Sequence, residues 1–407
     1  MSRITPRIYV AEIPKAKTIV SVSTSVTAFV GRALTGPIDK ATLIHSYADY
    51  IRIFGGLWKE SNMSYGVYQY FQNGGTDAII VRVDAGAGKE LTEQVVKGDP
   101  TLKTGMYALE NADIFNLLCI PAFDASDSTR KNVYEAATAF CEKKRAILII
   151  DPPKQWTTKD AAEQGIKNYV SRNRNEAIYF PRIKAVDPVD QTLRDFDPCG
   201  AVAGTIARTD AQRGVWKSPA GIEANLIGIS DLTVQLNDAD NGDLNWQGIN
   251  CLRKLPDAGI VIWGAHTLSA DAEWKYLPVR RLALYIEESL YRGTQWAVFE
   301  PNNEQLWAQI RLYVGAFMHS LWIKGAFQGS KPDEAYFVKC DQETTPQEEV
   351  AAGFVNIMVG FAPLKPAEFI ILKIRQQQDK DVSMKQRLAT KPPIKPSKFI
   401  NGSTLRP

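Results

Sequence analysis

Between residues 78 and 263 the sequence alternates short apolar runs with longer helical patterns, and this alternation constrains the fold more than any other feature. The strand-like runs cover residues 78–83, 114–120, 146–150, 177–180 and 259–263, and the helical patterns cover 128–144, 160–170 and 200–213. Strands spaced by helices of about 10–20 residues form βαβ units with a largely parallel sheet. The sequence therefore predicts an α/β layered domain over residues 23–265. Ser46 and Asp49 have the spacing of a capping box that opens a further helix.

The pattern changes after Gly264. A helix is expected over 278–291, and Asn302, with Gln305 at the matching box position, is expected to cap the next one. That second helix has an apolar stripe at helical spacing, made of Leu306, Ile310, Phe317 and Leu321. Strand-like runs follow at 335–340, 354–361 and 368–374, with a short helix seeded at Pro346. These elements predict an α+β module over residues 266–378.

The two ends of the chain read differently from its middle. Residues 7–13 are β-forming and stop before Pro14, which predicts a detached strand within an N-terminal arm of residues 1–22. Residues 379–407 are basic and contain prolines, most clearly at 391–396. Such a tail cannot build a core, so it is expected to be extended, either against a partner surface or in solvent.

Composition excludes several classes of protein. Lys plus Arg total 48 and Asp plus Glu total 45, and a net charge of +3 argues against a nucleic-acid binder that relies on bulk positive charge. The 5 cysteines are widely spaced with no CxxC, and no two of the 3 histidines lie four residues apart, so neither a disulfide framework nor a zinc site is expected. No apolar run reaches the ~20 residues of a membrane span. The first residues lack a secretory pattern, and we expect folding in a cytoplasm.

The sequence lacks the motifs of common α/β enzymes. It has no phosphate loop, no dinucleotide fingerprint and no nucleophile elbow. His266, after a predicted strand, is the one histidine placed to act as a base, and Asp151 is the best single carboxylate, although a structural role fits each better. We therefore predict no enzyme activity, no cofactor and no metal. An α/β enzyme of unknown substrate that uses His266 or Asp151 is the alternative.

The predicted terminal strands suggest a role in assembly. A strand can add to an exposed sheet edge of another subunit through backbone hydrogen bonds. When every subunit lends strands head to tail, the contact is heterologous and generates rings or open helical lattices. The alternative is that both strands pair within one subunit.

Several segments resemble the contractile tail sheath proteins of phage tails, R-type tailocins and extracellular contractile injection systems. The matching strings are STSVTAFVGR (23–32) with GP (36–37), FGGL (54–57), YFQNGG (70–75), GAVAG (200–204), RTDAQRGVWKSP (208–219), YIEES (285–289), GTQWAVFEPN (293–302), FVKCD (337–341) and APLKPAEF (362–369). They occur in the family's order, and the resemblance runs from about residue 5 to residue 374.

The resemblance implies a structural subunit with an outer α/β domain and an inner α+β assembly domain, joined to its neighbours by N- and C-terminal strand arms. Such subunits stack as hexameric rings around an inner tube. After triggering at the baseplate the sheath contracts and drives the tube through a target membrane. The implied partners are copies of the chain, the tube protein, baseplate and terminal cap proteins, and paralogous sheath subunits. Neither nucleic acid nor direct membrane insertion is implied. Assembly is expected in a bacterial cytoplasm, within a phage tail or tail-like particle that can be released.

The resemblance also implies which residues link subunits. The N-terminal linker strand consists of Arg7, Ile8, Tyr9, Val10, Ala11, Glu12 and Ile13. The C-terminal linker strand includes Glu368, Phe369, Ile370, Ile371, Leu372 and Ile374. The host strand contains Phe354, Val355, Ile357, Val359 and Phe361.

A tube-facing surface is expected on the charged helix 278–292, with Arg280, Arg281, Glu287 and Glu288. Salt links inside the subunit are the alternative for these four charges. Residues 237–256 match the family less well and are expected to form a surface insertion, and the chain continues for about 30 residues past the family's last strand. The subunit's compactness favours an injection system or a tailocin over a large phage.

Overall fold

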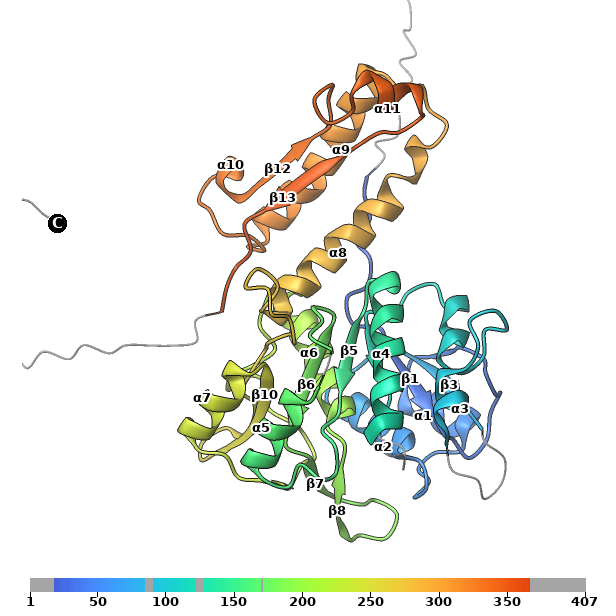
Figure 1. Ribbon diagram of the computed structural model, residues 1–407, viewed down its shortest axis with the longest axis vertical. Coiled ribbons are helices and arrows are strands. Elements are labelled where there is room, and N and C mark those ends of the chain that lie inside the picture. Colours follow the sequence, from blue (N-terminus) through green and yellow to red (C-terminus); the bar gives the residue numbers. More distant parts are fainter. Residues whose placement is uncertain (1–17, 85–90, 122–126, 170, 367–407) are drawn as a thin grey trace, which may run out of the picture. The chain divides into compact units, whose positions relative to one another are not determined.

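The computed structural model describes residues 18–84, 91–121, 127–169 and 171–366 (Figure 1). A sheet of eight strands, in the order β11-β10-β6-β5-β4-β1-β3-β2, forms its largest element. The strands are β1 (Thr27–Gly31), β2 (Thr42–Ile44), β3 (Ala78–Arg82), β4 (Leu117–Cys119), β5 (Ile147–Ile150), β6 (Glu176–Phe180), β10 (Ile249–Leu255) and β11 (Gly259–Ile262). The edge strands β2 and β11 run antiparallel to their neighbours and the others run parallel, so the predicted α/β sheet is confirmed.

Helices cover both faces of this sheet because its strands are apolar on both sides. On β4, Leu117 and Cys119 face one hydrophobic cluster and Leu118 faces the other. The first cluster packs under α1 (Tyr47–Phe54), α2 (Asn62–Gln72) and α6 (Cys199–Arg213). The second packs under α3 (Glu93–Lys97), the 3₁₀ helix η1 (Gly105–Asn111), α4 (Asp127–Lys144), α5 (Lys159–Lys167) and α7 (Asp238–Trp246).

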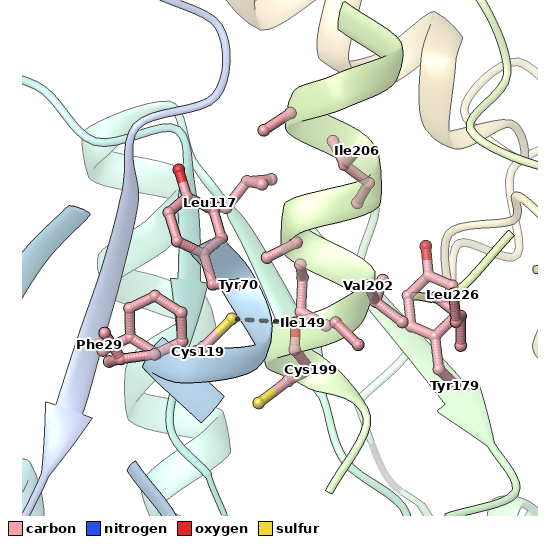
Figure 2. Packing of buried hydrophobic residues seen from close by; sticks show 14 of the residues in the cluster. Phe29, Tyr70, Leu117, Cys119, Ile149, Tyr179, Cys199, Val202, Ile206 and Leu226 are labelled. Carbon is pink, nitrogen blue, oxygen red and sulfur yellow. Dashed lines mark hydrogen bonds between the residues drawn. The ribbon is translucent and has the colours of Figure 1, made fainter. Parts of the chain in front are cut away.

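Helices α2 and α6 cross at a point where both lack side chains. A Cβ atom built on Gly200 of α6 would lie 2.1 Å from the backbone oxygen of Gly66 on α2. This contact lets α6 lie directly over the sheet, where Cys119 donates a weak hydrogen bond to the carbonyl oxygen of Cys199 at 3.7 Å (Figure 2). The small residues of α6 therefore allow its close packing against α2 and the sheet.

The outer edge of β11 is closed by the chain itself. The amide of Leu226 donates to the carbonyl of Ile260 at 2.7 Å, and the amide of Ile262 donates to the carbonyl of Ala224 at 3.0 Å. Between them, Asn225 and Val261 form an antiparallel β-bridge. At the opposite edge, β2 is only three residues long. A separate small sheet, β8-β7-β9, consists of β7 (Ile183–Val186), β8 (Leu193–Phe196) and β9 (Asp231–Leu232).

A third hydrophobic cluster organises the C-terminal elements. Its members come from α8 (Leu277–Gly293), α9 (Glu304–Ile323), β12 (Tyr336–Lys339) and β13 (Met358–Phe361), with the 3₁₀ helix η2 (Gln295–Ala297), α10 (Pro332–Ala335) and α11 (Gln347–Ala351) between them. The predicted stripe of α9 is buried in this cluster. Helix α8 contributes Leu277 and Leu284 to the first cluster but Leu282 and Ile286 to the third.

Two expectations about local structure are wrong. Asn303, not Asn302, caps α9 by accepting the amide of Leu306 at 3.1 Å. The side chain of Asn302 instead accepts the indole N–H of Trp307 and donates to the carbonyl of Phe354. Residues 237–256 are not a surface insertion, since they form α7 and β10 and β10 pairs with β6 inside the main sheet.

Candidate assembly surface

The antiparallel strands β12 and β13, which are connected through α11 and are here called the hairpin, belong to the described part of the predicted linkage site. The two strands pair antiparallel from Tyr336 opposite Phe361 to Lys339 opposite Met358. One face of the hairpin packs on the third cluster through Val338 and Val359. The other face is open, and the half-exposed ring of Phe337 covers Gly360, where a Cβ atom would lie 2.2 Å from the ring.

The backbone of β13 has polar groups that point away from β12. The amide of Ala362 donates to the carbonyl of Ala335 at 2.8 Å, which identifies this pair as hydrogen-bonded. Hydrogen-bonded and non-hydrogen-bonded pairs alternate along an antiparallel ladder, so the amides and carbonyls of Phe361 and Val359 point outward. Among the described residues β13 has no strand on that side. This edge can therefore accept a further strand.

The predicted host residues divide between the strand and the segment before it. Val359 and Phe361 lie in β13, whereas Val355 and Ile357 precede it and are partly buried against the third cluster. Phe354 is 61% exposed. The predicted linker strands 7–13 and 368–374 lie outside the described residues, so their role stays a prediction.

The charges of α8 pair within the subunit. Arg280 and Arg281 are each only 4% exposed. Arg281 binds both carboxylate oxygens of Asp210 at 2.6 and 2.8 Å, and Arg280 donates to the side chain of Asn175 at 2.9 Å. Two arginines this deeply buried cannot present a surface to the tube. The internal contacts that the sequence left as the alternative are therefore present: Arg281 forms a salt link with Asp210, and Arg280 binds Asn175 and lies 3.4 Å from Glu287 of the same helix. Contact between this helix and the tube stays a prediction.

The two glutamates of α8 differ in exposure. Glu288 is paired with Arg145 and Arg292, both at 2.7 Å, and its side chain is 15% exposed. Glu287 lies 3.4 Å from Arg280 and its side chain is 46% exposed. Of the four charged residues that the sequence suggested for tube contact, Glu287 is the most accessible.

His266 and Asp151 occupy structural positions. His266 is buried, its backbone amide donates to the side chain of Asn250 at 2.6 Å, and its Nδ1 lies 3.0 Å from the carbonyl of Asn245. The Oδ1 atom of Asp151 accepts the backbone amide of Cys199, the first residue of α6, at 2.8 Å. Burial, with the nearby carboxylate of Asp197, raises the pKa of Asp151 to about 8. These contacts fix the strand ends and the start of α6.

Two further features bear on function. Among the described residues, no group of three or more His, Cys, Asp or Glu side chains could hold a metal ion. Within the same residues, no helix is both long enough and apolar enough to cross a membrane.

Comparison with known protein families decides the identity. Residues 96–268 match the phage tail sheath protein central domain, and residues 269–377 match the phage tail sheath C-terminal domain. The chain belongs to the phage tail sheath family. This sheath protein is a structural subunit of a contractile tail sheath and not an enzyme.

Individual relatives agree with this assignment. The sheath protein is 27% identical over 302 residues to a prophage major tail sheath protein of Pseudomonas aeruginosa strain UCBPP-PA14, covering 71% of this chain and 74% of the relative. It is similar to a chain of the PVC sheath complex of an extracellular contractile injection system in the contracted state, with 29% identity, a TM-score of 0.75, and 93% and 99% of the two chains covered. It is also similar to a chain of the six-fold symmetrised anti-feeding prophage baseplate, with 29% identity, a TM-score of 0.73, and 93% and 100% of the two chains covered.

The sequence patterns did not single out a second apolar stripe on α9, opposite the buried one. The signal was present, because residues 312–323 contain no Lys, Arg, Asp or Glu. A helix whose surface is apolar on both sides is not expected in contact with water.

Proposed function

We propose that the chain assembles as stacked six-fold rings around an inner tube and that contraction of this array drives the tube through a target membrane. The observation that carries the proposal is the similarity, over 93% of the chain, to a contractile injection system sheath in its contracted state. The relative from a six-fold symmetrised baseplate supports the ring symmetry and contact with baseplate proteins. Cap proteins and paralogous sheath subunits are further proposed partners. Assembly in a bacterial cytoplasm before release is part of the proposal.

In this proposal an N-terminal arm and a C-terminal arm link each subunit to its neighbours. Residues 7–13 and 368–374 supply the linker strands, and the outward edge of β13 at Val359 and Phe361 receives one of them. The layout consists of the arm 1–22, an outer α/β domain 23–265, an inner domain 266–378 and a basic tail 379–407. Each net hydrogen bond contributes only about 0.5–1.5 kcal/mol, but a strand makes several and a lattice repeats them many times.

Contraction requires that the contracted lattice be the more stable one. We propose that it buries more apolar surface between α/β domains than the extended lattice. At about 25 cal/mol per Å², a few hundred Å² more per subunit would give several kcal/mol, repeated over every subunit. Equal buried area in the two states would contradict this source of energy.

Negative-stain electron microscopy tests assembly directly. The full-length protein, alone and co-expressed with its genomic neighbours, is expected to form hollow cylinders with six-fold striation. Deleting residues 1–14 should abolish cylinders and leave a soluble, folded subunit. Intact cylinders from this deletion would refute linkage by the N-terminal arm, and a lasting monomer from the full-length chain under both conditions would refute the polymer.

A matched pair of proline substitutions tests which edge of the hairpin is used. Val359 and Val338 lie opposite each other, and their amides point to opposite outer edges. Val359→Pro removes an amide donor from the proposed host edge and should block cylinders, whereas Val338→Pro should not. Circular dichroism confirms that both variants fold. Cylinders from folded Val359→Pro subunits would show that this edge is not the host.

A further inference from the structure

Helix α9 has an apolar face that the described residues do not cover. Opposite its buried stripe, residues four or seven positions apart lie on one exposed face. This outer stripe consists of Ala308, Leu312, Gly315, Ala316 and Ile323. His319 lies on the same face, and its ring packs near Trp322 and Tyr336 with Nδ1 3.1 Å from the Tyr336 hydroxyl. Leu312 is 64% exposed and Ile323 is 69% exposed, and the helix between them carries no Lys, Arg, Asp or Glu. Contiguous exposed apolar surface of this kind marks an interaction site.

Gly315, in the middle of the outer stripe, is a second and independent indication. Among the described residues, a Cβ atom added there would meet nothing within 4 Å, so the packing of this part of the chain does not require a glycine. Glycine inside a helix destabilises it relative to alanine. The packing of the described residues thus gives no reason for Gly315, whereas the absence of a side chain permits another backbone to approach α9 closely.

We infer that the outer stripe of α9 is buried against a second copy of this chain in the assembled sheath. The inference rests on the proposed function, because a sheath places further copies against every subunit. The inner tube is a poorer occupant: it slides past the sheath during contraction, and contacts that must be released are more polar than permanent ones. The outer stripe has the composition of a permanent contact.

The contact must join α9 to a different surface of the neighbouring copy. A contact between two α9 helices related by a two-fold axis would be isologous and would close a dimer. A polar helical array needs heterologous contacts, in which each subunit uses one surface toward the neighbour on one side and another toward the opposite neighbour. The outer stripe is therefore one half of a head-to-tail interface.

Two substitutions test the inference in the full-length chain. Leu312→Glu places a charge on the outer stripe, and Gly315→Leu fills the space that the neighbour needs. The control, Leu102→Glu, makes the same change at a residue that is 74% exposed in the α/β part. We expect both stripe variants to reduce the number of cylinders at least tenfold in tube-free preparations, with unchanged or higher melting temperatures, and we expect Leu102→Glu to match the wild type.

Cysteine labelling locates the contact without disturbing it. The 5 native cysteines are all buried, so a Leu312→Cys side chain should be the main site of reaction with a polar maleimide. It is expected to react in the free subunit and to be protected at least tenfold in tube-free cylinders. Protection in the free full-length subunit would mean that another segment of the same chain covers the outer stripe, and it would overturn the inference.

The remaining outcomes separate this inference from the proposed function. Wild-type protein that never forms cylinders refutes the proposed function itself. Wild-type cylinders accompanied by equally abundant cylinders from both stripe variants refute only the α9 contact. Stripe variants that assemble without the tube but fail with it would assign the outer stripe to the tube and overturn the inference. An equal loss of cylinders from Leu102→Glu would also overturn it, because the effect would then not be specific to the stripe.

Discussion

Arg281 on α8 and Asp210 on α6 form a two-pronged ion pair in which the side chains are only 3% and 4% exposed. Arg281 also donates to the carbonyl of Thr24 at 2.9 Å, so a single guanidinium joins the helix α8, the helix α6 and the segment that leads into β1. Because α8 belongs to both the first and the third hydrophobic cluster, this ion pair ties the α/β layers to the C-terminal elements.

Removing one partner of this ion pair should strongly lower the free energy of unfolding. Arg281→Met leaves Asp210 as a buried, unpaired carboxylate, and we expect a loss of about 3–5 kcal/mol in the free energy of unfolding. The control is Arg213→Met on α6. One guanidinium nitrogen of Arg213 donates to both carboxylate oxygens of Glu223, the two side chains are 51% and 60% exposed, and this pair should contribute at most about 1 kcal/mol. Urea denaturation measures both, and equal losses would contradict the role given to burial.

Two helix glycines should respond oppositely to alanine. Gly200→Ala would push a methyl group into the backbone of Gly66 and should lower the free energy of unfolding by about 1–3 kcal/mol. Gly315→Ala meets open space and should raise it by about 0.5–1 kcal/mol, since only helix propensity changes. Thermal unfolding of the free subunit tests the pair. A stabilised Gly200→Ala variant would mean that α2 and α6 can separate without penalty.

Asp151 should make the subunit less stable as the pH rises. Burial, with the charge of Asp197, raises its folded-state pKa to about 8, whereas an unfolded aspartate titrates near pH 4. Between these values the folded state holds a proton that the unfolded state has lost, so this residue's contribution to stability falls with increasing pH. Asp151→Asn cannot titrate and can still accept the amide of Cys199.

The test is the stability difference between Asp151→Asn and the wild type. The variant's advantage in urea midpoint should be larger at about pH 8 than at about pH 5, across the window set by the raised pKa. A difference that is constant with pH, or that shrinks as the pH rises, would show that the folded-state pKa of Asp151 is not raised.

Replacing Phe299 with glycine should raise the free energy of unfolding. Its φ is 70° and its side chain is fully exposed, so a bulky residue adopts a left-handed conformation without burying its ring. Phe299→Gly relieves that strain, and after the cost of a more flexible unfolded chain we expect a net gain of about 0.5–1 kcal/mol. At the neighbouring Val298, where φ is −67°, the same change should instead cost about 0.5–1 kcal/mol. A loss of stability in both variants would contradict the strain at Phe299.

Local signals in the sequence predicted much of the fold. Ser46 accepts the amide of Asp49 as the capping pattern indicates, and α1 ends at Gly55 in a left-handed conformation. The predicted runs correspond to β3, β4, β5, β6 and β11. Strands β2 and β10 were not predicted: β2 has only three residues, and β10 mixes Asn250, Arg253 and Lys254 with apolar residues and becomes a strand through its pairing with β6.

The buried charges show what a pattern cannot supply. Arg280 and Arg281 look like surface residues on a helix, and only contacts with Asn175 and Asp210, which lie 105 and 71 residues away, bury them. The residue types of a candidate site were visible in the sequence, but the partner that decides whether each side chain faces solvent was not.

The closed edge of β11 has a consequence for polymer order. In a sheath, identical subunits are held side by side, so any accessible strand edge meets many identical edges. Residues 224–226 occupy the edge of β11, and β2 offers only three residues at the other end of the sheet. Within the described residues, the edge strands β8, β12 and β13 are each four residues long and each pairs on one side only. The closed edge of β11 and the short edge of β2 thus limit the number of strand pairings in which neighbouring subunits could associate out of register.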